Sequence, residues 1–272
     1  MSHDDLRSLI RQVIVEVTVK DVQDRHDVKG STHTMQTGVI DGDVHYIKFS
    51  DEWSFDEGVD PSLQPLVEYL AYALYTLYGV RVPKNIHLVF DVEEEAVGIA
   101  TSRVQGSMAL KSASPMMIAS HISAGAYVDI FLANWDVVGT DDGNIIYDRD
   151  VDEMVRIDPG GSLTFRAQGG RKSSNFSSQP SELETMFDPE KSGTGHVFKH
   201  VDLKKAAERF LSVSLNDVIQ RCEAVNSEIT SELTTHGLMS LLDQWNSDYT
   251  EIMQKLPYRW KTITAHAKMN VA

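Results

Sequence analysis

The chain has 272 residues, with 25 lysines and arginines against 40 aspartates and glutamates, and therefore a formal net charge of −15. This acidic balance argues against nucleic acid or an anionic membrane surface as a partner, because binding to either depends on neutralising phosphate groups. The single cysteine, Cys222, excludes an intramolecular disulfide framework. The N-terminal sequence is polar and lacks the apolar core of a signal peptide, so we expect a soluble, cytoplasmic protein.

The first 105 residues show mainly strand patterns and one clear helix pattern. Alternation of β-branched and polar residues, and short apolar runs, predict strands. In chain order these are 12–20, the two arms of a hairpin over 38–50 with an Asp-Gly turn, 81–90 and 96–104. The segment Asp60-Pro61-Ser62 is a typical helix start, and leucines at helical spacing predict a helix that ends at Gly79.

The rest of the chain is mainly helical in pattern. Helices are predicted over 115–134, 203–213, 216–224, 227–245, 248–255 and 260–267, and two short strands over 144–148 and 154–158. A strand-rich first part followed by a helical second part predicts an α+β fold with two lobes and a cleft between them. We place the N-lobe at residues 1–105 and the C-lobe at residues 106–272.

A turn of small residues at 30–34 (GSTHT) precedes the hairpin. Backbone N–H groups in such a turn can bind phosphate oxygens, although a turn without any ligand has the same composition. Lys48 lies among apolar neighbours on a predicted strand and needs either an anion or access to solvent. Glu68 is the only charged residue between Asp60 and Arg81. It is the natural ionic partner for Lys48, and a narrow solvated helix face is the alternative.

Three polar residues further along have the chemistry of a magnesium–nucleotide site. Asp136 follows an apolar helical segment, Asn144 begins the first short strand, and Asp158 ends the second. Phosphoryl transfer from ATP needs one carboxylate to orient the attacking hydroxyl, and a carboxylate and an amide oxygen to hold Mg²⁺ on the phosphates. Pairing of the two strands would bring these side chains to one side of the cleft. Asp141 and Asp142 in the connecting loop are a rival metal pair, or simple turn residues.

The order of these features resembles the protein-kinase-like fold, and in particular its atypical branch, which includes actin-fragmin kinase, HipA-type kinases and the phosphatidylinositol kinases. The matching segments read GSTHT, YIKF, VEYLAYALYTLYGVRVP, FLANWDVVGTDDGNII and VRIDPGGSLTFRAQGG, and together they span residues 28–170. The GxGxxG loop and the His-Arg-Asp triplet of typical protein kinases are not in the sequence, and Asp158 is followed by Pro159. The resemblance implies an ATP- and Mg²⁺-dependent kinase that phosphorylates a Ser or Thr hydroxyl of a protein substrate.

The resemblance also implies how this chain would bind the phosphates of ATP. Backbone around Gly30, Ser31 and Thr32 would cover them. Lys48 would bind the α- and β-phosphates and would pair with Glu68.

On the other side of the cleft, the resemblance implies that Asp136 is the catalytic base or the group that orients the hydroxyl. Asn144 and Asp158 would bind Mg²⁺, and residues 102–106 would receive the adenine. Two alternatives stay open. One is a nucleotide-binding pseudokinase that acts as a protein-interaction module, and the other is a kinase whose acceptor is a lipid or a small molecule.

Residues 160–181 occupy the place of an activation or substrate-binding segment. Arg166, Arg171 and Lys172 make it locally basic on an acidic chain, so we expect it either to attract an acidic substrate or to be a solvated loop. The carboxylate-rich run 136–153 is interpreted as belonging in part to the metal site.

Overall fold

The structure is a computed structural model that describes residues 17–27, 34–50, 56–104, 107–109, 114–139, 143–149 and 151–271. Within these ranges the N-terminal part forms a six-stranded sheet in the order β1-β5-β6-β4-β3-β2. The strands are β1 Val17–Thr18, β2 Gln23–Asp27, β3 Thr34–Ile40, β4 Asp43–Phe49, β5 Ile86–Asp91 and β6 Ala96–Ser102. Of the strand predicted over 12–20, residues 12–16 lie outside the described residues, and a short 3₁₀ turn, η1 Val19–Asp21, follows β1.

The predicted hairpin is confirmed as β3 and β4. Its turn places Asp41 and Gly42 at φ of 52° and 85°, which is why an Asp-Gly pair suits this position. Successive side chains of β4 point to opposite faces of the sheet. Ile47 packs into a small outer cluster with residues such as Val89, so Lys48 projects from the inner face.

Helix α2, Leu63–Leu77, covers that inner face. The side chains from Leu63 to Tyr75 are all buried, so α2 is a central helix with other elements around it. Its start is tied to the sheet, because the backbone N–H of Val97 in β6 donates to the Ser62 hydroxyl at 2.9 Å. Its end is set by Gly79, whose φ of 63° ends the helix as predicted.

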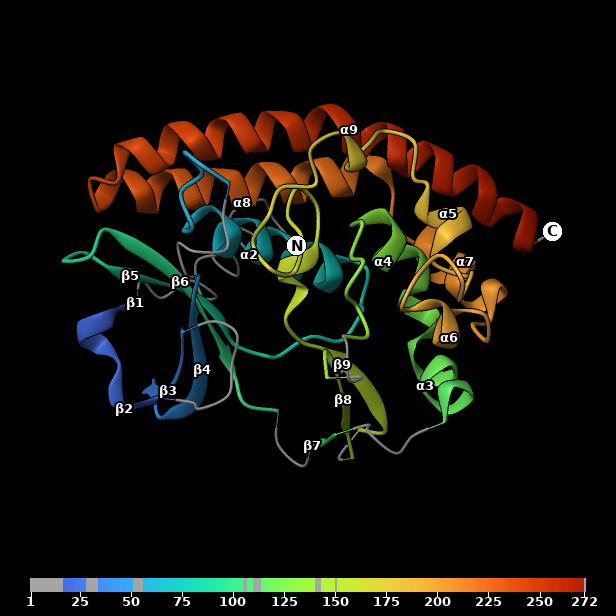
Figure 1. The fold of residues 1–272 in the computed structure, drawn as a ribbon, viewed down its shortest axis with the longest axis horizontal. Helices are drawn as coiled ribbons and strands as arrows, with labels where there is room; N and C mark the ends of the chain where they lie inside the picture. Colours follow the sequence, from blue (N-terminus) through green and yellow to red (C-terminus); the bar gives the residue numbers. More distant parts are fainter. Residues whose placement is uncertain are drawn as a thin grey trace, which may run out of the picture.

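The C-terminal part is helical, with a small sheet in the order β7-β8-β9. The helices are α3 Pro115–Ile122, α4 Ala126–Phe131, α5 Glu182–Thr185, α6 Gly195–Phe198, α7 Leu203–Leu211, α8 Leu215–Thr235 and α9 Met239–Val271. The small strands are β7 Ser107–Ala109, β8 Ile145–Asp148 and β9 Glu153–Arg156, and the 3₁₀ turns are η3 Ser123–Gly125, η4 Pro159–Gly161 and η5 Ser173–Asn175. Figure 1 shows α8 and α9 side by side along one long edge of the molecule, with α2 packed between α8 and the large sheet.

Several predicted helix boundaries are wrong. Gly237, with φ of 73°, separates α8 from α9, so the helices predicted over 216–224 and 227–245 are redistributed between these two. Pro257 lies inside α9 without ending it. Buried residues on both sides of it, such as Leu256 and Ile263, keep the helix on the core. The single helix predicted over 115–134 is divided by η3 into α3 and α4.

None of the helices in the described ranges is both long and apolar enough to cross a membrane. The main hydrophobic cluster instead joins α2 to the C-terminal helices, with residues such as Leu70, Phe131, Phe210 and Trp245 in one continuous core.

Arg259 of α9 attaches this long helix to the end of α4. Its guanidinium donates to the carbonyl oxygens of Ile130 and Phe131 at 2.5 and 3.0 Å, at the helix C-terminus where carbonyl groups lack helical partners. The same guanidinium lies 3.1 Å from the Glu182 carboxylate, and both side chains are almost completely buried. Because α4 leads directly into Asp136, this contact fixes the start of the candidate catalytic segment.

We expect Arg259→Met to destabilise the protein by about 3–5 kcal/mol, since it leaves the buried Glu182 carboxylate uncompensated. Urea denaturation measures the free energy of unfolding. The matched control is Lys261→Met on an exposed position of the same helix, which should change it by no more than about 0.5 kcal/mol. A loss below about 1 kcal/mol in Arg259→Met would contradict this account of the contact.

Candidate active site

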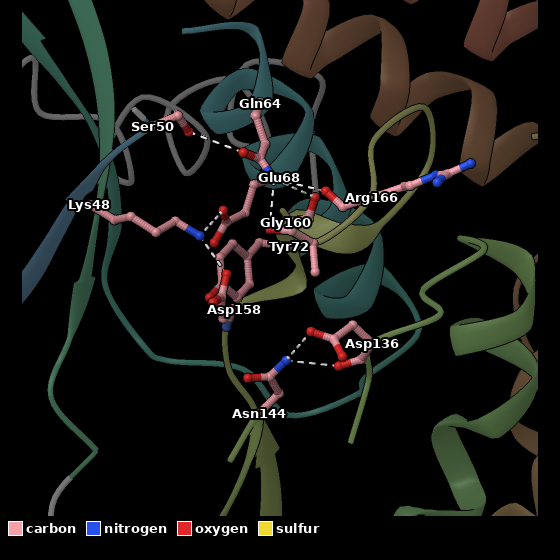
Figure 2. Close-up of polar contacts among 11 residues, drawn as sticks. Lys48, Ser50, Gln64, Glu68, Tyr72, Asp136, Asn144, Asp158, Gly160 and Arg166 are labelled. Atoms are coloured by element: carbon pink, nitrogen blue, oxygen red, sulfur yellow. Dashed lines mark hydrogen bonds and ion pairs between the residues drawn. The ribbon is translucent and has the colours of Figure 1, made fainter. Parts of the chain in front are cut away.

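The ion pair that the sequence predicts between Lys48 and Glu68 is present on the inner face of the large sheet. Lys48 Nζ lies 2.6 Å from Glu68 Oε2, and the two side chains are 9% and 2% exposed. The same ammonium also contacts Oδ1 of Asp158 (Figure 2). Strand β4, helix α2 and the segment after β9 therefore meet at one buried cation.

Asp158 occupies a strained position that holds its carboxylate toward Lys48. Its φ and ψ are 51° and 58°, a left-handed conformation that is uncommon for a residue with a Cβ. Its backbone N–H donates to the Tyr72 hydroxyl at 3.0 Å. Two residues later, a Cβ at Gly160 would lie 2.9 Å from Glu68 Oε2, so the close approach of this turn to α2 requires glycine.

Burial and the charges of neighbouring groups act in opposite directions on the pKa values of Lys48 and Glu68. Burial alone would lower the pKa of Lys48, but the charges of Asp158 and Glu68 outweigh it and raise that pKa above its usual value. Burial raises the pKa of Glu68 to about 7, and the Asp158 charge adds to this while Lys48 opposes it. Two carboxylates therefore share one ammonium, which leaves the cluster short of positive charge.

Asp136 and Asn144 form the opposite side of the site. The Asn144 amide nitrogen donates to the backbone oxygen and to Oδ2 of Asp136, at 2.8 and 3.0 Å. Its amide oxygen is turned away from Asp136 (Figure 2). Gly139, with φ of 79°, lies close against Asn144, since a Cβ there would lie 3.1 Å from the Asn144 backbone nitrogen. The Ile157 N–H donates to the Asn144 carbonyl at 3.0 Å and so links this side to Asp158.

The carboxylate of Asp136 is half-buried. Burial raises its pKa and the nearby Asp158 charge raises it further, whereas the hydrogen bond from Asn144 lowers it. A carboxylate whose pKa is raised holds a proton more readily than a free aspartate does. Asn144 therefore orients a half-buried carboxylate whose pKa is raised.

The donor chemistry of Asn144 and Asp158 fits Mg²⁺, which prefers carboxylate and amide oxygens. Among the residues that the structure describes, no three His, Cys, Asp or Glu side chains gather as a metal site. A bound ion would therefore depend on the amide oxygen of Asn144, the carboxylate of Asp158 and oxygens of its ligand.

The carboxylate-rich run 136–153 was predicted to belong only in part to the metal site, and three of its members have other partners. Asp148 lies 2.8 Å and Glu153 3.6 Å from the Arg81 guanidinium, and Asp152 accepts a hydrogen bond from Tyr147. These three contacts hold the β8–β9 hairpin in place.

A cavity of about 270 Å³ opens beside the Lys48 cluster. Its walls combine side chains of the sheet with apolar side chains of β8 and the segment after β9. The lining includes Met35, Tyr46, Lys48, Glu68, Tyr72, Pro83, Ile99, Thr101, Arg103, Val104, Ile146, Ile157 and Asp158. The linker predicted to receive adenine spans 102–106, and its described residues 102–104 line this cavity. Lys48 lines the same cavity, so the apolar pocket and the ammonium of Lys48 lie side by side.

Gln64 is a site residue that the sequence patterns did not reveal. It lies one turn before Glu68 on α2 and is 1% exposed. Its side-chain nitrogen donates to the carbonyl of Gly160 at 3.0 Å and to that of Arg166 at 3.2 Å, and its oxygen accepts from Ser50 at 3.1 Å (Figure 2). Gln64, Glu68 and Tyr72 thus form a polar stripe at four-residue spacing along α2. The sequence signal that could have revealed Gln64 was this spacing of polar residues in a helix that is otherwise almost wholly apolar.

A second buried network, made of an ion pair and hydrogen bonds, extends from Arg156 to the backbone of Asp136. Arg156 of β9 pairs with Asp129 of α4 at 2.8 Å, and Tyr75 of α2 donates to the same carboxylate at 2.9 Å. Asn134 donates to the Tyr75 hydroxyl at 3.0 Å and accepts from the Asp136 N–H at 3.3 Å. A lone aspartate in the apolar sequence AYVDIF was the sequence signal for this network.

The local basic patch predicted at 166–172 is not formed. Arg166 is exposed, but Arg171 lies 2.5 Å from the Asp248 carboxylate and Lys172 is completely buried. The segment is packed against the helical part and includes η4 and η5, because the cationic side chains find carboxylate, carbonyl and aromatic partners there.

Some predicted residues cannot be placed. Gly30, Ser31 and Thr32, and the rival pair Asp141 and Asp142, lie outside the described residues. Lys48, Glu68 and Asp158 are in mutual contact, and Asp136 and Asn144 form the neighbouring contact.

No protein-family model matches the chain, and no curated protein sequence matches it. Among solved structures, the chain is similar to the proinflammatory kinase CtkA of Helicobacter pylori, with a TM-score of 0.53 and 12% identity over 94% of this chain and 99% of that one. Two structures of the choline kinase LicA, one from Streptococcus pneumoniae and one in complex with AMP, have TM-scores of 0.35 at 12% and 13% identity. They cover 94% and 95% of this chain and 99% and 100% of their own.

The fold is therefore an α+β protein-kinase-like fold, with a strand-rich N-terminal part and a helical C-terminal part. The predicted fold class is confirmed. At 12% identity the likeness concerns the fold, so the role of each residue must be argued from the geometry above.

The raised pKa of Glu68 predicts a pH dependence of stability. Since the pKa is about 7 in the folded chain against an ordinary 4.5, the folded state binds this proton more tightly than the unfolded state. The free energy of unfolding, relative to a Glu68→Gln variant, should therefore fall as the pH rises from about 5 to about 7.5. Denaturation series at several pH values measure this difference. The exposed Glu208→Gln is the control, and a difference that grows with pH would disprove the assignment.

Proposed function

We propose that this protein is an ATP·Mg²⁺-dependent phosphotransferase that phosphorylates a Ser or Thr hydroxyl of a protein substrate. The observation that carries the proposal is the meeting of Lys48, Glu68 and Asp158 beside an apolar cavity, with the Asp136–Asn144 pair on the adjoining side. A buried cation and an oriented carboxylate serve transfer from a nucleoside triphosphate, together with groups that can hold Mg²⁺. An apolar pocket beside them can receive the base. The similarity of the fold to that of the kinase CtkA supports this reading.

The cavity suits a nucleotide whose base enters between the sheet and the C-terminal part. Ile99 and Tyr46 offer apolar and aromatic surface on one side, and Ile146 and Ile157 on the other. The phosphates would then reach the ammonium of Lys48. Glu68 and Asp158 hold that ammonium in place before the nucleotide arrives, so little reorganisation is needed during the reaction.

In the proposed reaction the acceptor hydroxyl oxygen attacks the γ-phosphorus while the bond from that phosphorus to the β,γ-bridging oxygen breaks. The proton of the hydroxyl passes to the carboxylate of Asp136, and ADP leaves with the electron pair of the broken bond. Asn144 keeps Asp136 oriented through its two hydrogen bonds. Mg²⁺, held by Asn144 and Asp158, would neutralise charge on the phosphates.

A specific observation favours a small polar acceptor as the second candidate. A hollow of about 590 Å³ lies beside Trp135, the residue before Asp136. Its lining is rich in hydroxyl groups, from Ser174, Ser177, Ser181, Thr185 and Ser192. Such a wall would hydrogen-bond the polar groups of a small molecule.

Nucleotide binding is tested by the melting temperature. We expect ATP with Mg²⁺ at saturating concentration to raise the Tm by several degrees, because a ligand that binds only the folded state stabilises it. ATP without Mg²⁺ should raise it less, and Asp158→Ala should remove the Mg²⁺-dependent part. Asp243→Ala, at an exposed position on α9, is the control. No shift at millimolar ATP would contradict the proposal.

Catalysis is tested by transfer of radiolabelled phosphate from ATP. We expect Asp136→Asn to lower the rate by about 10²–10⁴-fold, since the amide cannot accept the proton of the hydroxyl. Binding of ATP should be retained, because Asp136 does not line the cavity. Unchanged transfer in Asp136→Asn would refute its assignment as the base. Wild-type protein that binds ATP without any transfer would instead indicate a pseudokinase.

A further inference from the structure

Lys172 is completely buried yet lies between the two turns that carry the candidate catalytic residues. Its Nζ donates to the carbonyl oxygen of Ala133 at 2.5 Å and to that of Gly161 at 2.7 Å. Ala133 precedes Asp136 by three residues, and Gly161 follows Asp158 by three residues. One amine therefore connects the backbone on the base side of the site with the backbone on the metal side.

The electrostatic surroundings of Lys172 are unfavourable for a charge. Within the described residues its amine forms no ion pair with a carboxylate, and its other close partner is the ring of Trp135, with the centroid 4.9 Å away. Burial lowers the pKa of Lys172 well below its usual value, and the charge of Glu182 only partly opposes this. The N–H groups of the amine have two acceptors, the carbonyl oxygens of Ala133 and Gly161. An apolar side chain of similar length would avoid the desolvation cost altogether.

Strained backbone lies at Ala133, which this amine contacts, and near its other contact at Gly161. Ala133, Leu163 and Ser173 have φ of 52°, 53° and 49°, in the left-handed region that residues with a Cβ seldom occupy. The backbone N–H of Lys172 itself donates to the carbonyl oxygen of Thr164 at 2.8 Å. The Leu163 N–H donates to the carbonyl oxygen of Leu132 at 2.6 Å. Strained turns persist where surrounding contacts hold them, and Lys172 supplies several of those contacts.

We propose that Lys172 is a positioning residue that fixes the turn bearing Asp136 against the turn bearing Asp158. The inference rests on the proposed function, because phosphoryl transfer is what gives the relative placement of the two turns a catalytic purpose. In-line transfer requires the hydroxyl on Asp136 and the γ-phosphate on the metal side to be aligned, and small misplacements of such groups reduce rates strongly. Lys172 reaches neither substrate nor nucleotide and acts only through these two backbone segments.

The alternative for Lys172 is a purely structural role, and the two predict different results for Lys172→Met, which removes the amine and keeps an unbranched side chain. A positioning residue should lower kcat, measured as ADP released from ATP·Mg²⁺ with water as acceptor, by about ten- to a hundredfold. The KM for ATP should change by less than about threefold, because the cavity walls are untouched. The Tm should fall by no more than a few degrees, since two buried carbonyl oxygens lose their donor but no buried carboxylate loses an ion-pair partner.

Amide hydrogen exchange supplies a readout that does not depend on activity. In Lys172→Met the amides of 133–139 and 158–165 should exchange faster, while those of α9 should not change. Lys204→Met, at an exposed position of α7, is the control and should match wild type in every measurement. If Lys172→Met does not fold, the same measurements on Lys172→Gln, which keeps two N–H donors on a shorter chain, replace it.

The outcomes separate this inference from the proposed function. Wild-type kcat with unchanged exchange in the Lys172 variant would overturn the positioning role. A Tm lowered by more than a few degrees, with faster exchange throughout the chain, would also overturn it, in favour of a structural role. Wild-type protein that neither binds ATP nor releases ADP would refute the proposed function, whereas faster exchange confined to the two turns would still establish the contact between them.

Discussion

The ammonium of Lys48 is the constraint on which the site depends. A lysine buried on the inner face of a sheet needs anions, and here it takes one from α2 and one from the segment after β9. Elements separated by about a hundred residues of sequence are therefore drawn to one point. Two carboxylates around one ammonium leave negative charge that an added cation would offset. The ion pair thus organises the fold and prepares the site at once.

The surrounding polar contacts have a common form, in which a buried side chain holds the backbone of a loop. Gln64 binds the carbonyl of Gly160, Tyr72 binds the N–H of Asp158, and Lys172 joins Ala133 to Gly161. These contacts hold backbone atoms of turns that contain strained residues, such as Ala133 and Asp158. Buried polar groups of this kind add little net stability, so their concentration at one place points to geometry as their purpose.

Much of the fold could be predicted from local patterns. The β3–β4 hairpin, α2 and the β8–β9 pair follow from Asp-Gly turn chemistry, leucine spacing and short apolar runs. The division of the C-terminal helices could not, because Gly237 ends a helix while Pro257 does not, and only packing distinguishes the two. The site was partly predictable, since Lys48, Glu68, Asp136, Asn144 and Asp158 each break an apolar or turn pattern with a charge or an amide.

The sequence by itself determined which side chains carry charge inside apolar elements, and in which order they occur. The reason is that the spacing of apolar residues indicates which faces of helices and strands are buried. Only the tertiary structure decided how those charges are used. Arg166, Arg171 and Lys172 are equivalent cations in the sequence. In the structure Arg171 forms an ion pair, Lys172 is buried and donates to two carbonyl oxygens, and Arg166 is exposed. The reason is physical. The partner of a charge, and hence its pKa and its role, is set by residues far away in the chain that the fold brings within a few ångströms.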